Sequence, residues 1–306
     1  MPKLAAPTRI PLPQAVEILL RREIRAPVIT DYELARLVFE AVTRGEVDGR
    51  TLRLTRRDPS RVDLNSVRRA LIDRGVLAQD RSLPATVFRL VSDVRPDPEV
   101  ILCALDPFRY VSHLSAMAYH GLSNRIPKIL FFTTPASSMW SSLAQERMHR
   151  DLGEEWASYQ ASGLPLLHRH RVERMQGQAI HLTQTRAHGG GFRLAMDGLL
   201  RVSTLGRTYL DMLRRPDLCG GMSHVVEIFE ERGAEHLPII VSELDKHGEP
   251  IERVRAGYLL EERCGLSDPR IVAWRAHAQR GGSRVLDPDA DYAPTFSERW
   301  MLSINV

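Results

Sequence analysis

SRVDLNSVRRALIDRG, residues 60–75, is the stretch that decides how the first third of this chain folds. At the roughly 100° per residue of an α-helix, Leu64, Val67 and Leu71 share one stripe, and polar side chains occupy the opposite face. Gly75 favours the left-handed backbone conformation that ends a helix. We therefore predict an amphipathic helix whose apolar stripe packs on a core.

The segments on either side of this helix predict the rest of a small domain. Two β-like runs, 76–79 and 86–90, follow the helix with a polar turn between them. Before it, the pattern predicts a helix at 14–24, a second helix opened by the capping-box pair Thr30 and Glu33, and a short strand. Helix, helix, strand, helix and a two-stranded wing is the order of a winged helix-turn-helix.

The distribution of charge divides the chain near the same place. Residues 1–95 hold 18 Lys and Arg against 12 Asp and Glu, whereas the remaining 211 residues hold 24 against 26. A positive excess in the first third is typical of a nucleic-acid-binding module attached to a neutral domain. Residues 92–98 carry two prolines and no periodicity, which indicates a linker. We therefore predict an α+β chain, with a winged helix-turn-helix DNA-binding domain at 1–95 and a larger mixed α/β domain at 96–306.

Arginines concentrate around the predicted recognition helix. Arginine suits DNA binding because its planar guanidinium bridges phosphate oxygens or the O6/N7 edge of guanine. On the helical wheel, three side chains point away from the core and are predicted to reach base edges: Asn65, Ser66 and Arg69. Five arginines are predicted to contact phosphates or, in the wing, a neighbouring groove: Arg56, Arg57, Arg61, Arg68 and Arg81. A solvated basic face used for protein contacts is the alternative.

The bulk composition is that of an ordinary globular protein, because 43% of the 306 residues are hydrophobic and 26% are charged. The three cysteines, Cys103, Cys219 and Cys264, lie far apart, so neither a structural zinc site nor a disulfide framework is indicated. No apolar run reaches the roughly 18 residues that a membrane span needs, and prolines stand where a signal peptide needs an apolar helix. We expect a cytoplasmic protein with no membrane partner.

The second part of the chain has a mixed pattern. Ser112 is expected to cap a helix that runs to His120, and a buried strand follows at 129–133. Residues 136–163 carry a poor helical signal. Residues 166–203 are β-like, with turns at 176–178 and at the glycine triplet 189–191, which is expected to join neighbouring strands as a hairpin.

From residue 204 onward the pattern is mainly helical. One helix is predicted around Val225 and Phe229, and a separate one around Ile240 and Leu244. The chain closes on an apolar strand-like run at 300–306, which we expect to be tied into the sheet of this domain.

The histidines in this part of the chain raise the question of a metal site. Four of them fall within 21 residues: His168, His170, His181 and His188. Carboxylates are sparse near these histidines and arginines intervene, which disfavours a cation, so no metal or other cofactor is predicted. No motif assembles a nucleophile, a base and an electrophile, so we do not expect an enzyme.

Three segments stand out in this part of the chain: YVSHLSAMAYHGLSNRIP (110–127), VSTLGRTYLDMLRRPDLCGG (202–221) and RVRAGYLLEE (253–262). They resemble the AbiEi family, whose members are antitoxins of type IV toxin–antitoxin (abortive infection) systems. The resemblance implies a protein with two roles. Its winged helix would bind inverted repeats in its own promoter as a cooperatively binding monomer and repress the operon. Its second domain would counteract a cognate nucleotidyltransferase toxin, directly or indirectly.

The segments that resemble the AbiEi family also suggest where a functional surface of the second domain would lie. Six side chains are candidates: His113, His120, Arg207, Asp211, Arg214 and Arg215. The preferred interpretation is that these segments determine the fold. Two other functions stay open: a ligand-responsive winged-helix transcription factor whose C-terminal domain senses a small molecule, and a DNA-processing enzyme that uses the histidine-rich strands.

Overall fold

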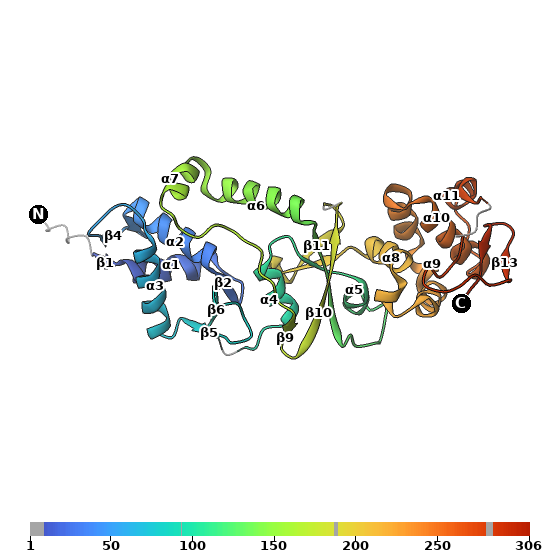
Figure 1. The fold of residues 1–306 in the computed structure, drawn as a ribbon, viewed down its shortest axis with the longest axis horizontal. Coiled ribbons are helices and arrows are strands. Elements are labelled where there is room, and N and C mark those ends of the chain that lie inside the picture. The colour runs from blue at the N-terminus through green and yellow to red at the C-terminus, as the bar shows by residue number, and fades with distance from the viewer. Residues whose placement is uncertain (1–8, 93, 187–188, 280–283) are drawn as a thin grey trace, which may run out of the picture. The chain divides into compact units, whose positions relative to one another are not determined.

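A computed structural model describes residues 9–92, 94–186, 189–279 and 284–306 of the chain (Figure 1). The fold is mixed α/β with several separate sheets. The chain divides into two compact units, each made of discontinuous segments. Unit 1 comprises Met1–Arg109, Thr134–Gln178 and Met196–Leu200, and unit 2 comprises Tyr110–Thr133, Ala179–Ala195 and Arg201–Val306. The first division between the units falls after residue 109, not at the predicted linker.

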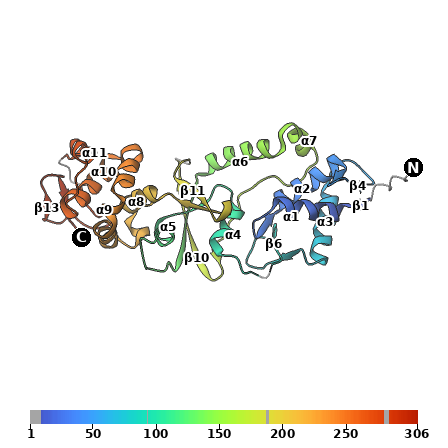
Figure 2. The same ribbon diagram turned by 180° about the vertical axis from the view of Figure 1, so that it is seen from behind.

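The first part of unit 1 is a group of three helices with two small sheets. Its elements are β1 (Ile10–Pro11), α1 (Leu12–Glu23), β2 (Val28–Thr30), α2 (Asp31–Arg44), β3 (Glu46–Val47), β4 (Arg50–Arg53), α3 (Arg61–Asp73), β5 (Leu77–Gln79), β6 (Val87–Leu90) and α4 (Pro98–Leu105). One sheet has the order β1-β4-β3 and the other β2-β6-β5. Helices α1, α2 and α3 pack against one another, as Figures 1 and 2 show from opposite sides. Strands β1, β2 and β3 and helix α4 are additions to the predicted set.

Local sequence explains where α2 and α3 begin and end. The Thr30 hydroxyl accepts a hydrogen bond from the Glu33 backbone N–H, and the Glu33 carboxylate accepts one from the Thr30 N–H, so the predicted capping box is confirmed. Helix α3 has an equivalent pair, Ser60 and Asp63, which the sequence analysis overlooked. The predicted stripe of α3 is buried, and Gly75 adopts a φ of +69° just after the helix.

Residues 134–178 also belong to unit 1 and form α6 (Ser137–Leu152), the 3-10 turn η1 (Gly153–Glu155), α7 (Trp156–Ala161) and β9 (Arg174–Met175). The poor helical signal at 136–163 was misleading. Only Trp140, Ala144 and Met148 are buried on α6, and this narrow stripe gives weak periodicity on a long polar helix. Met148 and Tyr159 join the core formed by α1, α2 and α3.

A six-stranded sheet, most of it in unit 2, has the order β11-β12-β7-β8-β10-β9. Its remaining strands are β7 (Tyr110–Val111), β8 (Ile129–Pro135), β10 (Gln178–Thr185), β11 (Phe192–Ala195) and β12 (Leu200–Ser203). The turn before β10 is confirmed, with Gln176 and Gly177 both at positive φ. The glycine triplet was wrongly predicted to form a hairpin, because the strands that it connects, β10 and β11, are not neighbours in the sheet.

The helices of unit 2 gather around a second apolar core. They are α5 (His113–Tyr119), α8 (Leu205–Arg214), η3 (Pro216–Cys219), α9 (Met222–His247), α10 (Pro250–Gly257), the π-helical turn η4 (Tyr258–Arg263), α11 (Pro269–Trp274) and η5 (Arg275–His277). The two helices predicted around Phe229 and Ile240 are one helix, α9, which continues through Pro238. Val225, Phe229, Ile240 and Leu244 all stay buried, so packing along the whole face supports the helix despite the proline.

The end of the chain forms a small sheet of its own. Strand β14 (Leu302–Ser303) pairs antiparallel with β13 (Phe296–Ser297). The prediction that the last strand joins the sheet of the domain was therefore wrong. Within the described ranges, no helix has both the length and the apolar character needed to cross a membrane.

Candidate functional site

The outward face of α3 is the first candidate site. Asn65, Ser66 and Arg69 are all exposed, while Leu64 and Val67 on the opposite face are buried. The prediction that these three polar side chains project away from the core is therefore confirmed as geometry. Their contact with base edges remains a prediction.

Arg68 is held inside unit 1 more firmly than the sequence indicated. Its Nη2 donates a hydrogen bond of 2.6 Å to Asn65 Oδ1, and its Nη1 lies 3.6 Å from Asp31 Oδ1. The guanidinium also sits 5.6 Å from the centroid of the Phe88 ring in β6. Arg68 thus joins α3 to the start of α2 and to the β5–β6 hairpin, which gives it a positioning role within the protein.

Ion pairing separates the other arginines of the first 95 residues into two groups. Arg74 is paired with Glu17 at 2.7 Å, and α1 and α2 likewise neutralise Arg21, Arg36 and Arg44 with glutamates. The arginines of the second group have no carboxylate partner among the described residues. They are Arg56, Arg57, Arg61, Arg69 and Arg81. The guanidinium groups without a carboxylate partner flank or occupy α3 and the turn between β5 and β6, where their positive charge is not neutralised by an ion pair.

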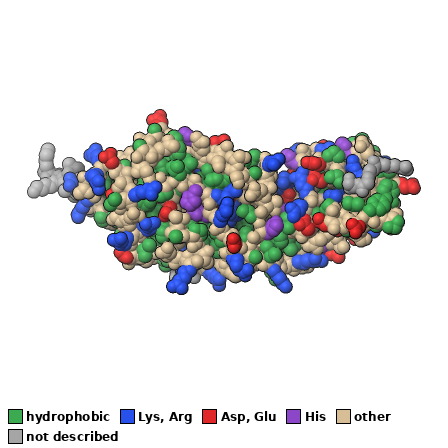
Figure 3. All heavy atoms as spheres, viewed as in Figure 1, with side chains coloured by type: hydrophobic (Ala, Val, Ile, Leu, Met, Phe, Trp, Pro, Cys, Tyr) green, Lys and Arg blue, Asp and Glu red, His purple; other side chains and the backbone are tan. Residues whose placement is uncertain are grey.

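Two details refine this second group. Arg61, the first residue of α3, donates a 2.6 Å hydrogen bond to the Gly163 carbonyl, which ties the helix start to the segment after α7. Arg89, on β6 of the β5–β6 hairpin, is also exposed and was missed by the sequence analysis. Figure 3 shows Lys and Arg side chains in blue over the region that Figure 1 labels β1, β4 and α3.

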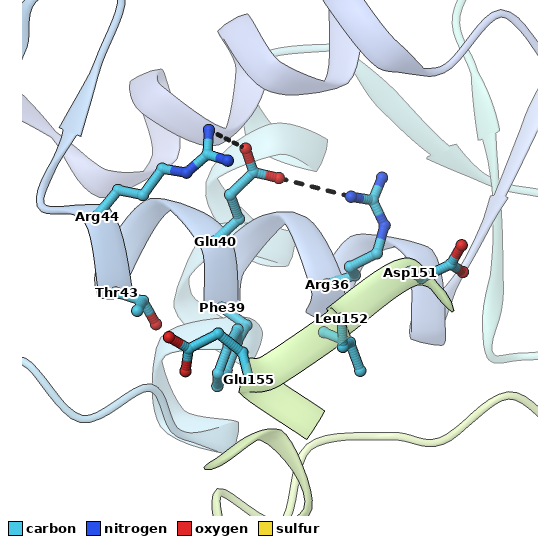
Figure 4. A pocket seen from close by; sticks show the side chains of 8 residues that line it. All are labelled: Arg36, Phe39, Glu40, Thr43, Arg44, Asp151, Leu152 and Glu155. Carbon is cyan, nitrogen blue, oxygen red and sulfur yellow. Dashed lines mark hydrogen bonds and ion pairs between the residues drawn. The ribbon is translucent and has the colours of Figure 1, made fainter. Parts of the chain in front are cut away.

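A small pocket in unit 1 lies between α2 and the end of α6 (Figure 4). It encloses about 180 Å³, which is less than the roughly 300 Å³ at which small-molecule sites begin. Glu40 accepts ion pairs from Arg36 at 3.5 Å and from Arg44 at 2.7 Å across its wall. The charges of this pocket largely neutralise one another, so it offers an anion little attraction.

In unit 2, His113 does not present a surface. Its side chain is buried at the start of α5, and its backbone adopts a φ of +50°. The Ser112 hydroxyl lies 2.8 Å from His113 Nδ1 and accepts a 2.8 Å hydrogen bond from the Thr133 hydroxyl. Burial lowers the pKa of His113, and the nearby Asp211 carboxylate opposes that shift. These contacts make His113 part of a buried polar network, which agrees with the fold-determining interpretation.

The remaining candidates of unit 2 are mostly engaged in internal contacts as well. Asp211 is buried and accepts a 2.9 Å hydrogen bond from Arg207, and Arg214 pairs with Glu252. His120 donates a 2.7 Å hydrogen bond to the Ser203 carbonyl. Arg215 is exposed and pairs with its near neighbour Asp217. A surface made of all six candidates is contradicted by the burial of His113 and Asp211.

The histidine-rich segment forms no strand at residues 166–173, contrary to expectation. His168 is exposed and His170 is buried, and burial lowers the pKa of His170 to about 4, with His168 adding to the shift. His181 lies in β10 against the Phe131 ring, and His188 falls outside the described residues. Within the described part of the chain, no group of three or more His, Cys, Asp or Glu side chains is placed to hold a metal ion.

Comparison with known proteins yields a distant structural likeness. No protein-family model matches the chain, and none of the curated proteins does. Its fold is similar to that of the RV2827C protein from Mycobacterium tuberculosis, known from a crystal structure, with a TM-score of 0.50 and 16% sequence identity. The likeness covers 95% of this chain and 90% of that chain. At this identity it indicates a shared fold alone.

Proposed function

We propose that this chain binds double-stranded DNA through α3 and serves as an antitoxin that represses its own operon. The observation that carries the DNA-binding half is the outward face of α3, where Asn65, Ser66 and Arg69 are exposed on a helix whose other face is core. Side chains with donors and acceptors on such a face read base edges when the helix lies in the major groove.

The surrounding elements support a winged helix-turn-helix. Helices α1, α2 and α3 pack together, and strands β2, β6 and β5 form one antiparallel sheet. In this proposal α3 is the recognition helix and the β5–β6 hairpin is the wing, with Arg81 and Arg89 exposed on it. Arg56, Arg57 and Arg61 lead into α3 and grip phosphates, which sets the register of the helix on the duplex.

The antitoxin half rests on the three segments that resemble the AbiEi family. In unit 2 they supply α5, α8 and α10, whose buried side chains build the second core. Arg215 is the exposed member of the candidate set. Unit 2 counteracts a nucleotidyltransferase toxin, and direct contact with the toxin is one of two routes, the other being indirect.

The DNA-binding half is tested by titrating labelled duplexes with the purified protein. The wild type is expected to bind the DNA upstream of its own reading frame more tightly than unrelated DNA of equal length. Arg69→Ala is expected to lose about 1–3 kcal/mol of specific binding and to reduce the preference. Arg21→Ala is the matched control, because Arg21 is exposed on α1 and paired with Glu17. Equal affinities for the two variants, or no binding by the wild type at low salt, would contradict the proposal.

The antitoxin half is tested in cells by expressing a neighbouring nucleotidyltransferase reading frame with and without this chain. Toxicity that this chain relieves supports the proposal. Failure to relieve it, together with a DNA affinity that changes on adding a small molecule, would favour the ligand-responsive transcription factor instead.

A further inference from the structure

A groove lined by arginines lies in unit 1, and part of its lining comes shortly before α3 in the sequence. It encloses about 660 Å³, and its lining comes from the residue before β1, from the end of α2, from β4 and from the loop that follows β4. The residues of this groove are Arg9, Gly45, Thr51, Leu52, Arg53, Leu54, Thr55, Arg56 and Arg57. Two of its four arginines, Arg9 and Arg53, were not candidates in the sequence analysis.

Pairing of β1 with β4 builds this groove. The two strands run parallel, with Ile10 opposite Leu52 and Pro11 opposite Arg53. This register brings Arg9 to the same end of the small sheet as Thr51, although more than 40 residues separate them along the chain. Four guanidinium groups from three segments therefore line one hollow.

The charge in the groove is uncompensated. No carboxylate belongs to the lining, and among the described residues none pairs with Arg9, Arg53, Arg56 or Arg57. A concave surface that carries one sign of charge concentrates its potential and attracts counter-charge. Guanidinium groups bind phosphate oxygens in pairs, and the Thr51 and Thr55 hydroxyls add neutral donors to the same hollow.

The lining also indicates which phosphate compound fits. It contains no aromatic side chain, so it offers no platform on which a nucleobase would stack. Its last arginine, Arg57, lies three residues before Ser60, the N-cap of α3. A ligand in the groove and a ligand on α3 are therefore held by one continuous stretch of chain.

We propose that this groove binds the sugar–phosphate backbone of duplex DNA flanking the segment that α3 reads, with Arg9 and Arg53 as additional phosphate contacts. This inference rests on the proposed function, and it extends the interface beyond the recognition helix and the wing. The groove adds affinity without base preference, because phosphates carry no direct sequence information.

The salt dependence of binding to the upstream duplex tests this proposal. Binding weakens as salt rises, and each lost phosphate contact makes the slope of log K against log salt concentration less steep by about 0.9, so the slope for the double variant R9Q/R53Q is expected to be less steep by about 1.8. Its affinity for unrelated DNA is expected to fall by the same factor. The control R21Q/R150Q removes two exposed arginines of α1 and α6 that lie outside the groove, and it is expected to leave the slope unchanged.

Duplex length provides the second arm of the test. Extending a minimal duplex by several base pairs on each side is expected to tighten binding by the wild type and to tighten binding by R9Q/R53Q less, because that variant keeps Arg56 and Arg57 in the groove. An unchanged slope for R9Q/R53Q, with Arg69→Ala still impaired, overturns the groove proposal and leaves the α3 interface standing. Loss of DNA binding by the wild type itself refutes the proposed function instead. Inorganic tripolyphosphate is the probe for a free ligand. If it competes with DNA for the wild type but not for R9Q/R53Q, and duplex length has no effect, the groove binds a free polyphosphate and the groove proposal is overturned.

Discussion

Gly257 is buried at the end of α10 and lies against the indole ring of Trp300, which belongs to the core of unit 2. A Cβ atom at this position would overlap three carbon atoms of the ring. Gly233, within α9, has room for a side chain. A Cβ atom added there would lie 3.6 Å from its nearest neighbour, Leu260 Cδ2, which is an ordinary van der Waals distance. These two helical glycines therefore offer a matched pair.

We expect Gly257→Ala to destabilise unit 2 by at least about 1–3 kcal/mol, the usual cost of forcing extra atoms into a packed core. Gly233→Ala is expected to be neutral or to stabilise by up to about 1 kcal/mol, because alanine is the better helix former. Urea denaturation followed by circular dichroism measures both changes. Equal midpoints for the two variants would show that Trp300 moves aside without cost.

The buried His170 side chain is expected to make the stability of unit 1 depend on pH. Its folded pKa of about 4 lies below the ordinary 6.5 because its side chain is buried. The unfolded chain therefore takes up the proton first, and stability falls as the pH drops from 6.5 to about 4. The expected loss by pH 4 is about 3 kcal/mol, from 1.36 kcal/mol for each unit of pKa shift.

His170→Gln is expected to remove this part of the acid sensitivity, and the measurement is the urea midpoint between pH 7 and pH 4. His149→Gln, an exposed histidine of α6, is the control and should retain the wild-type profile. A wild-type profile for His170→Gln would show that other groups dominate acid unfolding.

At the scale of the element, α3 depends on the capping box at its start. The Ser60 hydroxyl accepts a hydrogen bond from the Asp63 N–H, and the Asp63 carboxylate accepts one from the Ser60 N–H at 3.0 Å. These bonds satisfy backbone donors that the first turn of a helix leaves unpaired. The cap therefore sets where α3 begins relative to the arginines that precede it.

Ser60→Ala is expected to cost about 1 kcal/mol of stability and, because the first turn of α3 frays, to weaken DNA binding as well. Ser137→Ala, at the exposed start of α6 where no side-chain cap is formed, is the control. Urea denaturation and duplex titration measure the two effects. Unchanged stability in Ser60→Ala would show that water replaces the cap fully.

At the scale of the whole molecule, the core around α1, α2 and α3 is not complete at residue 95. Tyr159 of α7 is fully buried, and its ring makes edge contacts with Phe39 at 5.2 Å and Tyr32 at 6.2 Å. Met148 and Leu164 belong to the same core. Residues 134–178 therefore cover an apolar face of α2 that a fragment ending at residue 95 would expose.

We expect the fragment 1–95 to bind a hydrophobic dye and to melt well below the full chain. In the full chain, Tyr159→Ala is expected to cost unit 1 about 3–5 kcal/mol, as for other buried aromatic side chains. Tyr119→Ala, whose ring is 40% exposed on α5, is the control. If the fragment melts cooperatively and does not bind the dye, residues 1–95 fold on their own, as the sequence analysis predicted.

Sequence alone determined the features that depend on neighbours a few residues apart. The apolar stripe of α3, the Thr30–Glu33 capping box, the left-handed Gly75 and the outward direction of Arg69 all follow from helical geometry. These interactions close within one or two turns, so the chain encodes them locally.

Only the tertiary structure decided the features that depend on distant partners. Arg68 faces Asp31 and Phe88, and Arg9 lines a groove with Arg53 through a parallel strand pair. His113 is buried where a surface role was considered, since α5 lies within a polar network completed by Thr133. Periodicity reports which face of an element is apolar, but it does not say which other element covers that face. The α3 helix was therefore predictable from residues 60–75, whereas the set of arginines left free around it was decided by carboxylates elsewhere in the fold.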